Sequence, residues 1–134
     1  GTEKLVHNIS ISKDAQCLQQ SMHMALKSAG LETVDAIVTH APGTRKGDWA
    51  EVNAIKKVFT SKLPLITSNK FLIGHTFGAS GAMSLEMALL MLENNYFIKN
   101  PFYENDKNST KTLKTIMVNA VGFGGNAVSV IVSK

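Results

Sequence analysis

The spacing of apolar residues along the chain predicts alternating strands and helices, which is typical of a layered α/β domain. In the first helix, Leu18, Met22 and Leu26 recur on one face, and Gly30 stands where that helix should end. Short β-rich apolar runs between loops containing Pro and Gly indicate buried strands. The predicted elements are helices over 13–29, from about residue 48 and over 76–93, and strands over 34–39, 63–67, near 97, over 115–120 and over 127–133.

The predicted helix over 76–93 differs from the other two in being apolar nearly all round. It reads TFGASGAMSLEMALLMLE, and its only charged residues are Glu86 and Glu93. A helix of this kind is normally buried on every side. In a chain of 134 residues, either other elements wrap this helix or a second domain covers its outer face.

Composition excludes several classes of protein. Hydrophobic residues make up 44% and charged residues 18% of the 134 residues, which excludes a disordered chain. The apolar runs are too short for a membrane span, and no signal-peptide core is present at the N-terminus. Cys17 is the only cysteine, so no internal disulfide forms and a cytoplasmic location is the default. We treat residues 1–134 as one domain.

The net charge of +4 is scattered rather than clustered. The only adjacent basic residues are the pairs Arg45-Lys46 and Lys56-Lys57, which argues against a nucleic-acid-binding face. This charge suits an acidic protein or a phosphate-bearing ligand about equally well.

Two of the four histidines are candidates for chemistry. His40 and His75 each follow a predicted strand, and ligands gather at the carboxyl ends of strands in α/β folds. The alternative for each is a loop histidine bonded to the backbone. Lys70 lies in the same loop as His75 beside an apolar run, so we expect partial burial, which lowers the pKa of an unpaired ammonium group. His7 and His23 lie in polar or helical surroundings typical of the surface.

No metal site is predicted, because neither His40 nor His75 has a second His or Cys within five residues. Asp48 and Glu51 stand three residues apart, and we interpret them as structural residues of a helix-capping box. The Gly-Phe-Gly-Gly run over 122–125 either forms the turn of a hairpin or brings backbone N–H groups close to a ligand.

Three blocks together resemble the C-terminal half of the β-ketoacyl-acyl-carrier-protein synthases, the condensing enzymes of fatty acid and polyketide synthesis. THAPGTRKGDWAE is similar to the family's His-Gly-Thr-x-Thr segment with its later Asp and Glu. SNKFLIGHTFGASGA is similar to the Lys-x-x-x-x-His-x-x-Gly-Ala-x-Gly block, and VNAVGFGGNA to the Gly-Phe-Gly-Gly block. The blocks stand in the family's order and the likeness covers nearly the whole chain. The implied fold is a thiolase-like half-domain with a mixed, mainly parallel sheet and helices on both faces.

The resemblance implies a decarboxylative condensation. An acyl group is held on a cysteine, and malonyl-carrier protein loses carbon dioxide to give the enolate that attacks it. By resemblance, His40 and His75 donate hydrogen bonds from Nε2 to the enolate oxygen, and Lys70 sets the electrostatics and orientation of His75. Such donors lower a barrier by several kcal/mol.

The remaining implied roles concern the substrate. The Phe123 backbone N–H would help form the oxyanion hole of the acyl group, while its ring would gate the acyl pocket. Gly124 and Gly125 would bind substrate, and Thr44 would hydrogen-bond the phosphopantetheine arm. No cofactor is implied beyond this arm, which belongs to the acyl carrier protein and carries the substrate. Thiolases share the architecture, but they carry a cysteine in the turn that holds Phe123 here, and they lack a histidine at the position of His40.

The chain departs from the family at several positions. Ala41 and Pro42 replace the family's Gly and Thr, which puts one contact to the pantetheine arm in doubt. Ser84 stands where the family commonly has a glutamate, so Lys70 would lose its usual partner. After the glycine-rich block the family's Thr-Asn becomes Asn-Ala at 126–127.

The family's nucleophilic cysteine is absent, because it belongs to the N-terminal half, and Cys17 matches no family motif. The chain is therefore expected to be either a piece of a longer synthase or a natural half-protein, inactive alone. The expected partners are an acyl carrier protein, the N-terminal half of the synthase and a second copy in a homodimer. Two alternatives stay open: a non-catalytic partner like the chain-length factors, and a module that only binds the carrier protein.

Overall fold

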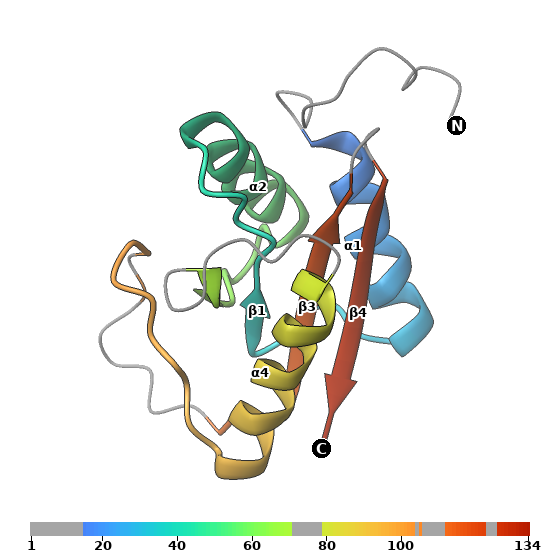
Figure 1. Cartoon of the computed structure of the whole chain (residues 1–134). Helices are drawn as coiled ribbons and strands as arrows, with labels where there is room; N and C mark the ends of the chain where they lie inside the picture. Colours follow the sequence, from blue (N-terminus) through green and yellow to red (C-terminus); the bar gives the residue numbers. More distant parts are fainter. Residues whose placement is uncertain (1–14, 71–78, 104, 106–111, 123–125) are drawn as a thin grey trace.

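A computed structural model describes residues 15–70, 79–103, 105, 112–122 and 126–134 of the chain. Helices and strands alternate in the first part, and two strands close the chain (Figure 1). The elements are α1 (Gln16–Ala29), β1 (Ala36–Val38), α2 (Arg45–Val58), β2 (Leu65–Thr67), α4 (Ser80–Asn94), β3 (Thr115–Val121) and β4 (Ala127–Ser133).

The four strands form one mixed sheet in the order β2-β1-β3-β4. Strand β1 pairs in parallel with β2 and β3, with Val38 opposite Thr67 and Val118. Strand β4 runs antiparallel to β3, which confirms the predicted hairpin strands. Because three of the strands are parallel, their carboxyl ends meet at one edge of the sheet, where α/β folds bind ligands.

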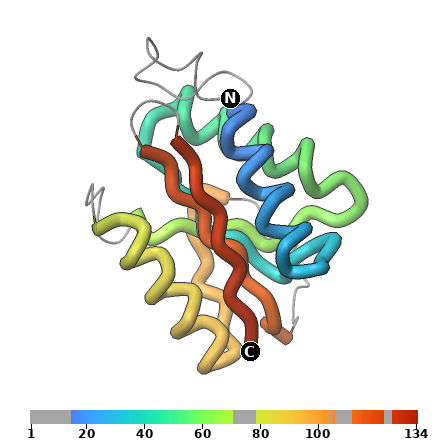
Figure 2. Tube along the Cα trace, turned by 90° about the vertical axis from the view of Figure 1, so that its right-hand side faces the viewer, coloured from blue at the N-terminus to red at the C-terminus, as the bar shows by residue number. Residues whose placement is uncertain are grey.

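Helices cover both faces of the sheet (Figure 2). Side chains alternate across a strand, so Ile37 and Met117 join one core with α1 and α2, and Val38 and Ile116 join the other with α4. The first core buries Leu18, Met22, Leu26, Ala50, Ala54 and Ile55 from the two helices; the second buries Met87, Ala88, Met91 and Leu92 from α4. The predicted fold class is confirmed.

One face of helix α4 is not covered by the described residues. Met87 and Met91 are buried against the sheet, whereas Leu89 and Leu90 are 46% and 49% exposed. The helix is therefore not buried on every side within this part of the chain. The sequence could not show this, because apolar residues on all sides of a helix do not reveal which side faces the sheet.

The strand expected near residue 97 is not formed, since residues 96–100 have no regular structure. This segment instead lies along β2, where the Thr67 hydroxyl donates to the Ile98 carbonyl oxygen at 2.6 Å. The Asn105 side chain pairs with the Ile66 backbone, accepting from its N–H at 2.8 Å and donating to its carbonyl oxygen at 3.0 Å. Side-chain hydrogen bonds thus replace a backbone ladder at this edge of the sheet.

Candidate functional site

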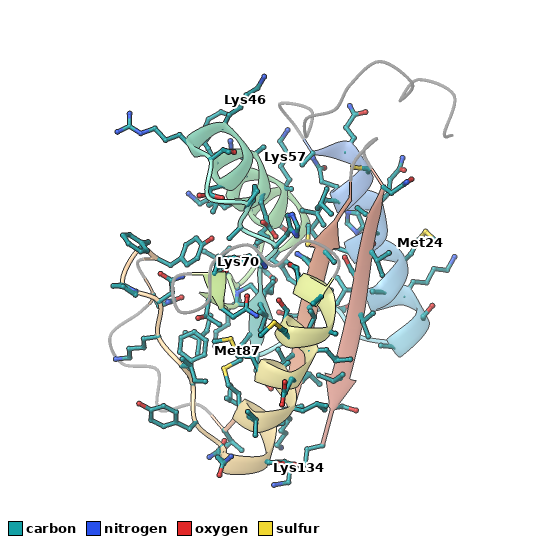
Figure 3. The ribbon with its side chains drawn as sticks, viewed as in Figure 1. Met24, Lys46, Lys57, Lys70, Met87 and Lys134 are labelled. Atoms are coloured by element: carbon teal, nitrogen blue, oxygen red, sulfur yellow. The ribbon has the colours of Figure 1, made fainter. Side chains whose placement is uncertain are left out.

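The candidate site begins where the parallel strands end. Thr39 follows β1, and its N–H and hydroxyl both donate to the Thr67 carbonyl oxygen, at 2.8 and 3.1 Å. His40 comes next on the β1 side and Lys70 lies three residues beyond β2, so adjacent strands deliver both side chains to the same edge. In Figure 3, Lys70 lies near the middle of the molecule.

A buried carboxylate holds the backbone at His40. Glu51 of α2 is 1% exposed, and its two oxygens accept from the N–H groups of His40 and Ala41, each at 2.9 Å. Ala41 has a φ of 40°, in the left-handed region that favours glycine. The turn that places His40, itself 7% exposed, therefore depends on Glu51.

Glu51 also connects the two strand ends electrostatically. Burial raises its pKa, while the N–H donors of Ala41 and His40 and the side chain of Asn119 act in the opposite direction. Burial lowers the pKa of Lys70, and the negative charge of Glu51 opposes that effect. The Lys70 ammonium group donates to the Asn69 side-chain oxygen at 3.3 Å. The predicted partial burial of Lys70 is confirmed.

The loop between β1 and α2 is fixed by side-chain caps. Thr44, not Asp48, is the N-cap of α2, and its hydroxyl oxygen accepts from the Gly47 N–H at 3.1 Å. Asp48 accepts from the Gly43 N–H at 3.2 Å, and Glu51 bonds the loop further upstream. The predicted capping box is therefore wrong, because both carboxylates satisfy loop N–H groups that precede the cap. Asp48 and Glu51 remain structural in a different way.

Close packing explains why position 47, in the first turn of α2, is a glycine. A Cβ atom there would lie 2.7 Å from both the Pro42 ring and the Thr44 hydroxyl oxygen. Since the Thr44 oxygen accepts from Gly47, its own proton remains available to a ligand. The position predicted for the pantetheine arm is therefore exposed and carries a hydroxyl donor.

Tyr103 is a site residue that the sequence did not indicate. Its hydroxyl lies 3.1 Å from the Thr39 hydroxyl oxygen, and Tyr103 must donate because Thr39 already donates to Thr67. Burial raises the pKa of Tyr103 to about 12, opposed by the Thr39 hydrogen bond. The only available signal was a tyrosine next to Phe102 at the start of the polar run PFYENDKNSTKT.

Asn119 was also missed. It is 1% exposed on β3, its side-chain oxygen accepts from the Ser129 hydroxyl at 2.8 Å, and its side chain hydrogen-bonds Glu51. A polar residue inside the apolar run of a predicted strand was the signal that could have found it.

Four of the predicted site residues, His75, Phe123, Gly124 and Gly125, lie outside the described residues. Within the described part of the chain, no three His, Cys, Asp or Glu side chains gather closely enough to hold a metal ion. No helix among the described residues is both long and apolar enough to cross a membrane.

Comparison with known protein families shows which family the chain belongs to. Residues 2–104 match the model of the β-ketoacyl synthase C-terminal domain. The chain belongs to the β-ketoacyl synthase family. A relative from Buchnera aphidicola, 3-oxoacyl-[acyl-carrier-protein] synthase 1, is 38% identical over 125 residues, covering 84% of this chain and 30% of the relative. The Escherichia coli K12 protein of the same name is 30% identical over 131 residues, covering 89% and 31%.

Solved ketosynthases share the fold of this family member. The ishigamide ketosynthase/chain length factor superposes with a TM-score of 0.84 at 22% identity, covering 98% of this chain and 35% of that one. A type II polyketide ketosynthase solved with its acyl carrier protein gives a TM-score of 0.78 at 26% identity, covering 96% and 36%. The β-ketoacyl synthase chain thus spans about a third of the length of the proteins it matches, and it corresponds to their C-terminal domain.

Proposed function

We propose that this domain supplies the His40, His75 and Lys70 part of a Cys-His-His condensation site in a 3-oxoacyl-[acyl-carrier-protein] synthase. The observation that supports this most is the placement of His40. Glu51 bonds its backbone in a buried turn at the end of β1, beside the β2 end that carries Lys70. The turn is held by the buried Glu51 carboxylate and by Ala41 in the left-handed backbone conformation. Such a constrained turn is expected where a side chain must be positioned precisely for chemistry.

In the proposed reaction, the bond between the malonyl carboxylate and its neighbouring carbon breaks and carbon dioxide leaves. The electron pair of that bond forms an enolate of the carrier-bound thioester. The enolate carbon attacks the acyl carbonyl on a cysteine, and the thiolate leaves as the new carbon–carbon bond forms. His40 and His75 donate from Nε2 to the enolate oxygen, where the negative charge develops.

The other chain residues have supporting roles. Lys70 sets the electrostatics and orientation of His75; burial lowers its pKa, and the negative charge of Glu51 opposes that effect. Thr44 donates its free hydroxyl proton to the pantetheine arm. The Phe123 N–H, with Gly124 and Gly125, accommodates the acyl carbonyl and the substrate. The nucleophilic cysteine comes from the N-terminal half of the synthase, and an acyl carrier protein delivers the substrates.

A non-catalytic, chain-length-factor-like role is the second candidate. Solved neighbours include a ketosynthase with its chain length factor from Xenorhabdus doucetiae, at 26% identity, a TM-score of 0.80, and coverage of 96% of this chain and 36% of that one. Pro42 replaces the family threonine, and Ser84 replaces its glutamate with a buried hydroxyl that bonds no described group. A cysteine at the nucleophile position of the full-length protein would favour the catalytic role.

The test is a pair of half-reactions in the complete synthase. With His40→Ala, malonyl decarboxylation should fall by roughly 10²–10³, whereas acylation of the cysteine should change much less. His23→Ala, an exposed residue of α1, is the matched control and should leave both rates unchanged. Unchanged decarboxylation in the His40 variant would contradict the proposal.

A further inference from the structure

Strand β4 forms one edge of the sheet, and the described residues add no strand beyond it. It pairs with β3 along its whole length, from Ala127 opposite Val121 to Ser133 opposite Thr115. Figure 2 shows β4 at the front of the molecule, with α4 on one side and α1 on the other. Within the described part of the chain, this edge is therefore open to a further strand.

The backbone groups of alternate β4 residues point outward from this edge. The Gly122 N–H donates to the Asn126 carbonyl oxygen at 2.8 Å, which extends the ladder between β3 and β4 by one bonded pair. Bonded and non-bonded pairs alternate along an antiparallel ladder, so the even-numbered residues of β4 bond β3. The N–H and carbonyl groups of the odd-numbered residues point away from β3, and these residues are Ala127, Ser129, Ile131 and Ser133.

Strand β4 lacks the features that usually protect an edge strand. Natural edges are protected by charged side chains, prolines, bulges, short strands or covering segments. The strand reads AVSVIVS, without charge or proline, and its register with β3 contains no bulge. At the opposite edge, the Asn105 side chain bonds the Ile66 backbone of the short strand β2. Among the described residues, the sheet is thus protected at its short edge strand and open at its long one.

The surface on both sides of this edge is uncharged. A groove of about 690 Å³ lies between α1 and β4, and every residue that lines it is uncharged, including Cys17, Met24 and Ile131. On the other face of the strand, Val128 and Val130 are 58% and 44% exposed. The chain as a whole carries a net charge of +4, which opposes the approach of a second copy. Two copies of the β4 edge can nevertheless meet without any like-charge contact.

We propose that β4 pairs antiparallel with β4 of a second copy of the chain, so that the two sheets join across a twofold axis. An antiparallel strand paired with its own copy is self-complementary, as a twofold interface requires. When the strands overlap along their whole length, Val130 lies opposite its own counterpart, and Val128 lies opposite Val132 of the other copy. This inference goes beyond the proposed function and does not depend on it.

The same register satisfies both the backbone and the side chains. The outward-facing groups of the odd-numbered residues meet one another, because Ser129 lies opposite Ile131 of the other copy, and they can exchange hydrogen bonds. The exposed Val128 and Val130 become cross-strand β-branched pairs, which stabilise sheets. A second copy therefore supplies the uncharged, β-branched strand that this edge fits.

Cross-linking through single cysteines tests this register. Val130 and its counterpart form a non-hydrogen-bonded pair, whose Cα atoms lie about 4.5 Å apart, within the range that a disulfide spans. In a chain that also carries Cys17→Ser, Val130→Cys should give a disulfide-linked dimer on mild oxidation. A non-reducing gel shows this dimer, and a reductant should remove it.

Val128→Cys, with the same Cys17→Ser change, is the matched control. Copies of residue 128 lie about 13 Å apart along the strand direction, so this variant should cross-link at least roughly tenfold more slowly. A mixture of Val128→Cys and Val132→Cys chains should give the mixed dimer, because these residues face each other in the proposed register. Equal cross-linking rates of the Val130 and Val128 variants would overturn the proposal.

A second measurement separates this contact from association through α4. Leu90→Glu disfavours contact at the α4 face, and sedimentation of this chain over a micromolar concentration range should still show a dimer. Adding Val130→Lys places two like charges opposite each other and should raise the dissociation constant roughly tenfold. Adding Leu63→Lys instead changes a residue of similar exposure, 43% against 44%, and should leave the constant unchanged. Circular dichroism checks that each variant is folded. A monomeric Leu90→Glu chain, or a dimer that Val130→Lys does not weaken, would overturn the proposal.

Discussion

At the scale of single residues, Ala41 occupies a conformation that suits glycine better. Its φ of 40° costs an L-residue roughly 1–2 kcal/mol. Replacement by glycine recovers only part of this cost, because glycine also makes the unfolded chain more flexible. Ala41→Gly should therefore raise the free energy of unfolding by about 0.5–1 kcal/mol, measured by urea denaturation. Ala82→Gly, exposed within α4, should lower it instead. A loss of stability in both variants would contradict the strained turn.

Tyr103 gives a second residue-scale prediction, based on its pKa of about 12. Because this pKa is raised above the ordinary tyrosine value of 10.0, the folded state holds the proton more tightly, and stability should fall as pH rises from 10.0 towards 12. Tyr103→Phe should remove this fall and the tyrosinate absorbance step near 12. It should also lower stability at neutral pH by about 1 kcal/mol through loss of the Thr39 hydrogen bond.

Tyr96→Phe is the control for that titration, since Tyr96 is the other tyrosine of the chain and is 67% exposed. The absorbance step near 12 should persist in this variant. Loss of the step on changing Tyr96, with no effect of changing Tyr103, would contradict the assignment of the raised pKa to the buried Tyr103 hydroxyl.

The sequence predicted the site unevenly, for physical reasons. His40 and Lys70 could be placed because strand ends are readable from apolar runs. The role of Glu51 was misassigned to a capping box, because sequence spacing shows only neighbours within a helix, not the loop it bonds. Tyr103 and Asn119 could not be found because their partners, Thr39 and Glu51, lie more than sixty residues away along the chain.

At the scale of elements, the Asn105 side chain hydrogen-bonds the backbone of β2 at the edge of the sheet, where a neighbouring strand would otherwise do so. Asn105→Ala removes the side-chain hydrogen bonds to the Ile66 N–H and carbonyl groups. Ile66 is only 5% exposed, so water cannot easily replace these bonds. An unmet buried polar group costs about 1–3 kcal/mol, so the loss of unfolding free energy should be at least about 2 kcal/mol. Urea denaturation measures this loss.

Asn94→Ala provides the control, because the exposed Asn94 amide also donates to a backbone carbonyl, that of Leu90, at 2.9 Å. Its stability change should stay within about 0.5 kcal/mol, as for most surface substitutions. Equal effects of the two substitutions would mean that the segment following α4 does not protect the edge of β2.

Element types were mostly predictable, while their edges were not. Helical periodicity predicted α1, because it reflects burial on one face, and β-branched runs predicted β3 and β4, whereas α4 was predicted from a long run that is apolar nearly all round. The strand near residue 97 was wrong, since the apolar Phe97 and Ile98 are half-buried in an irregular segment whose Ile98 carbonyl is bonded by a threonine hydroxyl. Apolar composition alone does not distinguish these two arrangements.

At the scale of the whole molecule, the face of α4 that the described residues leave uncovered predicts self-association. Leu89 and Leu90 are about half exposed there, and soluble monomers seldom leave large apolar patches open. Light scattering across a concentration range should show dimers or larger species, and Leu90→Glu should reduce them. Leu63→Glu, another exposed leucine remote from α4 in the sequence, should have little effect. A monomer at high micromolar concentration would contradict this prediction.

The central claim is that the chain holds one part of a catalytic site divided between two halves of a synthase. The most direct measurement is mass spectrometry of the carrier protein after incubation with acyl- and malonyl-loaded carrier. The complete synthase should yield a 3-oxoacyl product, and the purified 134-residue chain should yield none, because covalent condensation needs the cysteine nucleophile that it lacks. Product formed with turnover by the chain alone, or none by the complete synthase, would contradict the claim.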